Sequence, residues 1–367
     1  MTMESDAMES DAAVEVIDLT KHYGSVTALR SVSLRIASGE YFVLLGPSGG
    51  GKTTLLRLIG GFLKPTAGKI LLHGVDVSDL PPNKRPTSMV FQSYALFPHM
   101  NVERNVGYGL RLRRMKQGDI RDKVNAMLQL VGMSGLNKRK PHELSGGQQQ
   151  RVQLARSLVL DSDILLLDEP LAALDAKLRK DMCLELKHIQ EQVGITFLHV
   201  THNQEEAMTV ADHIAIIADG ELVESATPRD IYLNPRARFT AEFIGENNLL
   251  HGRIASSDRD EISIDLGHTT VRIPNADKAV EDGAEVSLSI PSEKLFLVDR
   301  ARDNLECLPA TFVERLFLGL TVNDRVRLVD GTDLQIRGLA SDTAPVPSTG
   351  EQVTVAWKRG DARLHTF

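Results

Sequence analysis

A chain of 367 residues with 42% hydrophobic and 25% charged residues has the composition of an ordinary soluble protein of two or three domains. Its net charge of −7 gives no basic field and argues against general nucleic-acid binding. The two cysteines, Cys183 and Cys307, lie far apart without metal-ligand spacing, so we expect buried thiols in a reducing compartment and no structural zinc site.

No apolar run approaches the roughly 20 residues that a membrane-spanning helix needs, because the most apolar pieces, YFVLL and DILLL, have the length of a strand. The N-terminal segment MTMESDAMESDA is a short acidic duplication without the basic and apolar regions of a secretory signal. We therefore predict a disordered acidic tail over residues 1–13 and a protein that does not cross the membrane.

Residues 14–244 alternate apolar runs of strand length with segments of helical periodicity, which predicts an α/β domain with a largely parallel sheet. SVSLRI alternates apolar and polar residues, and YFVLL is typical of a buried strand. Between Arg111 and Lys140 the sequence is basic and helical in pattern. We expect a helical insertion over about residues 93–160.

The segment GPSGGGKTT follows the YFVLL strand, precedes the helical run TLLRLIGGF and fits the G-x-x-x-x-G-K-[ST] pattern. Glycines let the backbone wrap a phosphate, Lys52 reaches the terminal phosphates and Thr53 offers a hydroxyl to Mg²⁺. The alternative, a flexible glycine turn, is disfavoured by the flanking strand and helix. We expect a site for ATP and Mg²⁺ whose loop residues are Gly46, Pro47, Ser48, Gly49, Gly50, Gly51, Lys52, Thr53 and Thr54.

DILLLDEP is an apolar strand that ends in two adjacent carboxylates. Asp168 and Glu169 therefore lie at the carboxyl end of a strand, where open α/β sheets bind ligands. We expect Asp168 to hold Mg²⁺ through water and Glu169 to polarise the attacking water. Two acids that merely end a strand beside a proline turn are the alternative.

Two further polar residues follow predicted strands. His202 comes after ITFLHVT and can contact a γ-phosphate, although a lone histidine is more often structural. Gln92 closes the apolar stretch TSMVF and is expected to sense Mg²⁺ or the attacking water. Tyr94, Leu96 and Phe97 beyond it form either a partner surface or a satellite core, which the sequence leaves open.

LSGGQQQR, residues 144–151, has no strand before it but is followed by VQLARSLVL, which has helical spacing. This predicts a helix N-terminus that binds an anion but cannot hold a whole nucleotide. It is half of a site, and the phosphates belong to the loop of another copy. The sequence thus predicts a head-to-tail homodimer that closes on two ATP molecules, with the half-site residues Ser145, Gly146, Gly147 and Gln148.

In this order, GPSGGGKTT, Gln92, LSGGQQQR, LLLDEP and VTH resemble the nucleotide-binding subunit of an ATP-binding cassette (ABC) transporter across roughly residues 14–240. The resemblance implies a P-loop NTPase cassette with an antiparallel β subdomain and a helical subdomain. It further implies that Tyr23 stacks on adenine, that Asp175 lies in the loop spanning the dimer, and that Glu169 is the catalytic glutamate.

Beyond Gly245 the segments EISIDL, TTVRIP, EVSLSI and EQVTVAW alternate apolar and polar residues, which predicts an all-β region of small barrels over residues 245–367. It resembles the oligonucleotide/oligosaccharide-binding-like (TOBE) domains of importer ATPases for polyamines, sugars and ferric iron. FQSYALFPHMNVERNVGYGL and VERLFLGLTVNDRVRL most resemble the spermidine/putrescine importers. Since a basic stripe with interleaved aromatics is missing, we expect no nucleic-acid partner.

The resemblance implies an ATP-hydrolysing importer subunit on the cytoplasmic face of the inner membrane, bound to integral permease subunits and acting indirectly with a solute-binding protein. Polyamine is the first expected solute, with ferric iron, sugar or another solute as alternatives. A soluble cassette ATPase of DNA repair or translation would usually carry a paired cassette or a coiled-coil insertion, and neither is visible in the sequence. A regulator without a permease is the third class.

Overall fold

The structure is a computed structural model that describes residues 12–93, 95–275, 280–299, 302, 304–341 and 346–366. The chain divides into two compact units, Met1–Arg229 and Asp230–Phe367. This division falls before the change of sequence pattern at 244/245. The expected tail lies outside the described residues except at Ala12 and Ala13, where β1 already begins, and Ala13 is fully buried. These two residues therefore belong to the first strand.

An antiparallel sheet opens the first unit, with strand order β2-β1-β4-β5. Its strands are β1 (Ala12–Tyr23), β2 (Val26–Ala37), β4 (Ala67–Leu72) and β5 (Val75–Asp76). The alternation of SVSLRI is kept in β2, where Val32, Leu34 and Ile36 are buried and their neighbours are exposed. One face of this sheet therefore packs on the core.

The second sheet of this unit has the order β10-β9-β3-β8-β7-β6. All neighbours are parallel except β9 and β10. Every residue of β3, β7 and β8 is buried, as expected for parallel strands covered on both faces. The expected α/β class is confirmed. Its strands are β3 (Tyr41–Leu45), β6 (Thr87–Val90), β7 (Ile164–Asp168), β8 (Thr196–Thr201), β9 (His213–Ala218) and β10 (Glu221–Ala226).

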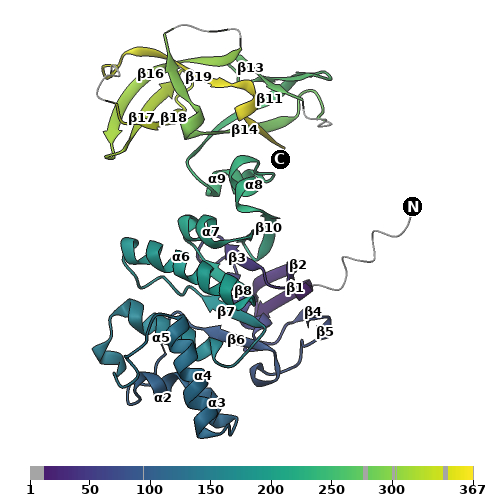
Figure 1. Cartoon of the computed structure of the whole chain (residues 1–367). Coiled ribbons are helices and arrows are strands. Elements are labelled where there is room, and N and C mark those ends of the chain that lie inside the picture. The colour runs from purple at the N-terminus through teal and green to yellow at the C-terminus, as the bar shows by residue number, and fades with distance from the viewer. Residues whose placement is uncertain are drawn as a thin grey trace, which may run out of the picture. The chain divides into compact units, whose positions relative to one another are not determined.

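Helices connect these strands, and the group from α2 to α5 lies between β6 and β7 in the chain, gathered beside β6 (Figure 1). In the described part of the insertion no strand interrupts them. None of the helices in the described chain has the length and apolar composition of a membrane span. The helices of this unit are α1 (Lys52–Ile59), α2 (Val102–Val106), α3 (Tyr108–Leu112), α4 (Gln117–Leu130), α5 (Gly146–Leu158), α6 (Ala176–Val193) and α7 (Gln204–Val210).

The second unit contains two antiparallel five-stranded sheets, of order β13-β12-β11-β14-β20 and β15-β19-β16-β17-β18. Apolar residues from both sheets form one core, in which Trp357 is fully buried. The expected all-β character is present. Its elements are α8 (Pro228–Leu233), which crosses the unit boundary, α9 (Arg238–Phe243), β11 (Asn247–Ser257), β12 (Glu261–Asp265), β13 (Thr270–Pro274), β14 (Glu285–Pro291), β15 (Phe296–Val298), β16 (Leu305–Phe317), β17 (Thr321–Leu328), β18 (Asp333–Leu339), β19 (Gln352–Lys358) and β20 (Arg363–Thr366).

Strand β8 buries a histidine in the centre of the first unit. His199 is fully buried, and its Nδ1 lies 3.0 Å from the hydroxyl oxygen of Tyr41. Burial lowers the pKa of His199 to about 3. Because this folded-state pKa lies below the value of about 6.5 in an unfolded chain, the neutral ring stabilises the fold above about pH 6.5. That stability is lost as the pH falls from about 6.5 towards 3.

We therefore expect His199→Gln to weaken the pH dependence of stability. The histidine contributes about 1.4 kcal/mol to the loss of unfolding free energy between about pH 7.5 and 5.5. The difference in unfolding free energy between wild type and variant should shrink by that amount over this range. Urea unfolding followed by far-UV circular dichroism measures it, since the single tryptophan, Trp357, reports only on the second unit. An equal pH dependence of the two proteins would contradict the assignment.

Candidate functional site

The loop between β3 and α1 needs glycine because it runs against neighbouring backbone. A Cβ on Gly46 would lie 2.0 Å from the carbonyl oxygen of Ile217, and one on Gly51 would lie 2.7 Å from the carbonyl oxygen of Ala28. Gly51 also has φ +105°, which favours glycine, and it directly precedes α1. Around Gly49 the space for a Cβ is open. The loop is thus packed on one side and leaves the N-terminus of α1 available to a phosphate.

Lys52 brings a buried positive charge into this loop. Its side chain is only slightly exposed, and Nζ donates hydrogen bonds to the carbonyl oxygens of Gly46 at 2.9 Å and Pro47 at 2.8 Å. Burial lowers the pKa of Lys52, and the nearby charge of Glu169 opposes that shift. A phosphate group would stabilise the charged amine far better than two neutral carbonyls. The loop is therefore suited to an anionic ligand.

A hydroxyl and a carboxylate meet beside Lys52. Thr53 Oγ1 donates to Asp168 Oδ1 at 3.1 Å, and Arg57 Nη2 lies 3.5 Å from Asp168 Oδ2. Burial raises the pKa of Asp168, while the Thr53 hydrogen bond and the Arg57 charge lower it. Oxygen ligands of this kind suit Mg²⁺ bound together with substrate phosphates. The residues therefore fit the expected metal, and Arg57, which sequence reasoning missed, lies one helical turn after Thr53.

Two predicted residues, Gln92 and His202, contact the carboxylate of a third, Glu169. Glu169 Oε2 accepts a hydrogen bond from Gln92 Nε2 at 3.1 Å, and Glu169 Oε1 lies 3.3 Å from His202 Nδ1. They follow the ends of β6, β7 and β8, which are adjacent parallel strands. Glu169 has φ +46°, a conformation uncommon outside glycine, and its N–H bonds the carbonyl oxygen of Val200 at 3.1 Å. The backbone thus directs this carboxylate between the two partners.

The residues of the predicted half-site lie at the start of α5. Ser145 Oγ accepts from the N–H of Gln148 at 3.3 Å, and Gln148 Oε1 accepts from the N–H of Ser145 at 3.1 Å. This reciprocal capping box fixes where the 13-residue helix begins, with Gly146 and Gly147 in its first turn. Within the described chain, no hydrogen bond or ion pair joins this capping box to the phosphate loop. In a single copy of the chain, the predicted half-site is therefore not bonded to the phosphate loop.

Two residues named by the resemblance occupy the ends of other elements. Asp175 caps α6 by accepting a hydrogen bond from the N–H of Leu178 at 3.0 Å. Tyr23 ends β1 with 47% of its surface exposed, and Lys21 Nζ lies 5.1 Å from its ring centroid. An exposed ring with a cation near it remains available for stacking on a base. Ser48 lies in the loop turn and Thr54 in α1.

A residue of α5 that sequence reasoning missed contacts the segment carrying Gln92. Gln153 is buried, and its Nε2 donates to the carbonyl oxygens of Phe91 at 2.9 Å and Ser93 at 3.3 Å. A signal was present, because Gln153 is a polar residue at a buried position of the VQLARSLVL helix. Its partners lie about 60 positions earlier in the chain, so the pattern alone does not identify them.

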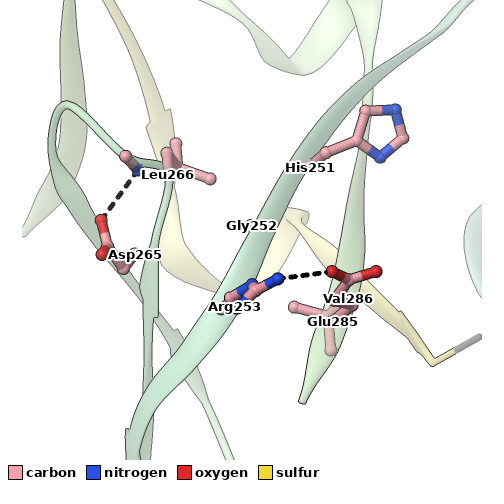
Figure 2. Close-up of a pocket in the computed structure, with 8 residues that line it drawn as sticks. His251, Gly252, Arg253, Asp265, Leu266, Glu285 and Val286 are labelled. Carbon is pink, nitrogen blue, oxygen red and sulfur yellow. Dashed lines mark hydrogen bonds and ion pairs between the residues drawn. The ribbon is translucent and has the colours of Figure 1, made fainter. Parts of the chain in front are cut away.

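A separate hollow of about 450 Å³ lies in the second unit (Figure 2). Its charged groups are already engaged: Arg253 Nη2 lies 2.7 Å from Glu285 Oε1, and Asp265 Oδ1 accepts from the N–H of Gly267 at 2.8 Å. The two members of the Arg253–Glu285 pair are well exposed to solvent. Such a pair contributes little binding energy, so the hollow carries no comparable chemistry.

Comparisons with known proteins identify the family of this chain. The family model described as ABC transporter matches residues 29–172. The spermidine/putrescine import ATP-binding protein PotA of Roseobacter denitrificans is 45% identical over 96% of this chain and 97% of its own length. The chain belongs to the ABC transporter ATPases. The putrescine transport ATP-binding protein PotG of Escherichia coli is 43% identical over 94% of this chain and 93% of its own.

Solved structures agree with this family at the level of the cassette. CbiO1 from Clostridium perfringens, part of an ABC transporter complex, is 28% identical with a TM-score of 0.57, over 60% of this chain and 90% of its own. The ATP-binding cassette MJ0796, solved as a dimer in a post-hydrolysis state with ADP and phosphate, is 32% identical with a TM-score of 0.53, over 59% of this chain and 99% of its own. This chain is accordingly an ATP-hydrolysing enzyme of the ABC class.

The site geometry predicts a difference between two variants of this ABC ATPase. Glu169→Gln keeps the shape of the side chain but removes the carboxylate that we expect to act as the base, so ATP turnover should fall by roughly 10²- to 10⁴-fold while ATP binding is retained. Lys52→Ala should weaken ATP binding as well, because it deletes the buried charge. Phosphate release and equilibrium binding of a fluorescent ATP analogue measure the two effects.

Glu205→Gln is the matched control for this experiment. Glu205 is a well exposed acid whose carboxylate forms a surface ion pair with Lys180 at 3.7 Å. Its variant should hydrolyse ATP like the wild type. Wild-type turnover in Glu169→Gln would show that another group activates the water.

Proposed function

We propose that this chain is the ATP-hydrolysing subunit of an importer that takes up a polyamine such as spermidine or putrescine. The observation that carries the proposal is its 45% identity to a spermidine/putrescine import ATP-binding protein over nearly the whole length of both chains. A putrescine transport ATP-binding protein is similar over almost the same span. The second unit is included in both matches, and importers for sugars or ferric iron are the alternatives to be tested.

In the proposed reaction the Gly46–Thr53 loop wraps the phosphates of ATP, and Lys52 exchanges its two carbonyl partners for phosphate oxygens. Thr53 and Asp168 would hold Mg²⁺, which would supply positive charge beside the phosphates. Glu169 accepts a proton from the water that attacks the γ-phosphorus, and ADP leaves. Gln92 and His202 hold the Glu169 carboxylate in place, and His202 also faces the γ-phosphate.

A second copy of the chain would complete each site. The N-terminus of α5 presents main-chain N–H groups, and Ser145 and Gln148 flank it, so it can bind the phosphates held by the other copy. Asp175 would then lie in the loop that passes between the two sites. The dimeric state of the similar cassette supports this proposal. A head-to-tail homodimer with two composite sites follows from it.

Permease subunits would dock beside α3 and the segment after Gln92. A groove of about 710 Å³ is lined there by apolar and basic residues. Phe97 is partly buried in this groove, 4.6 Å from the ring of Tyr108 and 5.3 Å from the guanidinium of Arg156. Tyr94 lies outside the described residues. We place the chain on the cytoplasmic face of the inner membrane as a peripheral subunit, coupled through the permease to a solute-binding protein.

The dimer proposal is tested by complementation between two inactive chains. Ser145→Arg should retain ATP binding and abolish hydrolysis, because a bulky side chain blocks the partner's phosphates. Lys52→Ala should also be inactive. Mixed dimers have one site with both lesions and one site with neither, so some ATP hydrolysis should return, measured as phosphate release after mixing. The absence of any recovery in demonstrably mixed dimers would argue that each signature acts on its own nucleotide.

The importer proposal is tested in the complex assembled with its permease and solute-binding protein in lipid vesicles. Spermidine or putrescine should stimulate ATP hydrolysis, whereas a sugar or ferric ion should not. Phe97→Glu should abolish this stimulation and retain the hydrolysis of the isolated chain, because its side chain lies away from the phosphate loop. If only a sugar or ferric ion stimulated ATP hydrolysis, that solute would take the place of polyamine in the proposal. Full stimulation of ATP hydrolysis in Phe97→Glu would exclude the groove as the docking surface.

A further inference from the structure

The segment that carries Gln92 follows an outer strand of the sheet. Within the described residues, β6 lies at the end of the strand order and pairs with β7. The chain leaves β6 at Val90 as an irregular segment, so its carbonyl groups have no neighbouring strand to accept from. Main-chain carbonyls in such a place need other hydrogen-bond donors. Side chains of α5 supply them.

Four alternate carbonyl oxygens, those of residues 89, 91, 93 and 95, accept hydrogen bonds from three side chains of α5. The bonds are Ser157 Oγ to Met89 at 3.3 Å, Gln153 Nε2 to Phe91 at 2.9 Å and to Ser93 at 3.3 Å, and Arg156 Nη1 to Ala95 at 2.7 Å. The segment is therefore attached to α5 at these four carbonyl groups.

Gln153 has the most direct connection to the reaction. Its buried amide holds the carbonyl groups on both sides of Gln92, which fixes the backbone that directs the Gln92 side chain. Gln92 in turn donates to Glu169 at 3.1 Å. A single amide therefore holds the carbonyl groups of both residues that flank the donor to Glu169.

We propose that Gln153 is a positioning residue that aligns Gln92 with Glu169 and makes this alignment depend on the position of α5. The same helix begins at Ser145, the residue proposed to meet the partner's nucleotide. A helix moves as one body, so engagement of its N-terminus by the second nucleotide would move the amide of Gln153 as well. Closure of the dimer would thereby set the position of the Gln92 side chain beside Glu169. This inference rests on the proposed function, because it requires hydrolysis to proceed through Glu169.

The test is Gln153→Met in the purified full chain. Methionine fills a similar volume and is a good helix former, but it cannot donate to the two carbonyls. We expect kcat for ATP to fall about tenfold with KM changed by less than about twofold, because alignment rather than binding is lost. In a double-mutant cycle, Gln92→Ala should also lower kcat, and adding Gln153→Met to it should cause little further loss.

The chain contains a closely matched control. Gln190 of α6 is equally buried, and its Nε2 also bridges two carbonyl oxygens, those of Gly39 at 2.6 Å and Ile195 at 3.3 Å. Neither partner adjoins Gln92, so Gln190→Met should cost stability but leave kcat near the wild-type value. Thermal unfolding of both variants verifies that they are folded. If Gln153→Met does not fold, Gln153→Ala, which introduces no bulk, takes its place.

Three results would overturn the inference. They are wild-type kcat in Gln153→Met, wild-type kcat in Gln92→Ala, and independent, multiplicative losses in the double variant. A failure of the proposed function gives different results: Glu169→Gln would keep wild-type turnover, or the wild-type chain would not hydrolyse ATP. Neither of these proteins has a change in α5. Hydrogen exchange gives a second measurement: in Gln153→Met the amides of residues 91–97 should exchange faster, and in Gln190→Met they should not.

Discussion

The site depends on the parallel register of three strands. Pairing of Val90 with Leu167 and of Asp168 with Val200 brings the ends of β6, β7 and β8 to one edge of the sheet. Only there can the residues that follow each strand meet, and the left-handed backbone of Glu169 then turns its carboxylate between Gln92 and His202. The conformation costs on the order of 1–3 kcal/mol, which the fully buried strands around it can sustain. A shift of one residue in β6 would move Gln92 away from this carboxylate.

Burial shifts the pKa values of the two charged groups beside this carboxylate in opposite directions, and both shifts suit the same ligand. It lowers the pKa of Lys52 and raises the pKa of Asp168, so it disfavours the charged form of each. Phosphates would favour the charged amine of Lys52, and a divalent cation would favour the charged carboxylate of Asp168. Nucleotide and metal together would therefore offset the cost of burying both charges. The glycines support this arrangement, because Gly46 and Gly50 press against the backbone at Ile217 and keep the loop in place without side chains.

Much of this could be predicted from the sequence because the signals are local. The strand YFVLL, the glycine loop and the adjacent acids DE lie within short windows, and parallel strands whose ends carry polar residues imply that those residues converge. The start of the first strand was missed at Ala12 and Ala13, since an acidic repeat before them hides the strand pattern. The attachment to α5 of the segment around Gln92 could not be foreseen for a different reason. It joins residues about 60 positions apart, and the acceptors are main-chain carbonyls, which every residue carries and no sequence pattern marks.

A glutamine at a buried position of a helix nevertheless contains usable information. Leaving its amide without hydrogen-bond partners is costly, and main-chain carbonyls are acceptors that can meet this need. In the described chain Gln150 of the same helix is an exception, because its buried amide atoms have no hydrogen-bond partner. Carbonyls inside helices and paired strands are already bonded, which leaves those of irregular segments. Gln153 and Gln190 both follow this logic, each bridging two carbonyls of chain that lies outside regular structure or at its end. At Gln153 the irregular segment carries Gln92, the hydrogen-bond partner of Glu169, so a requirement of hydrogen bonding links the helix that begins after Ser145 to that carboxylate.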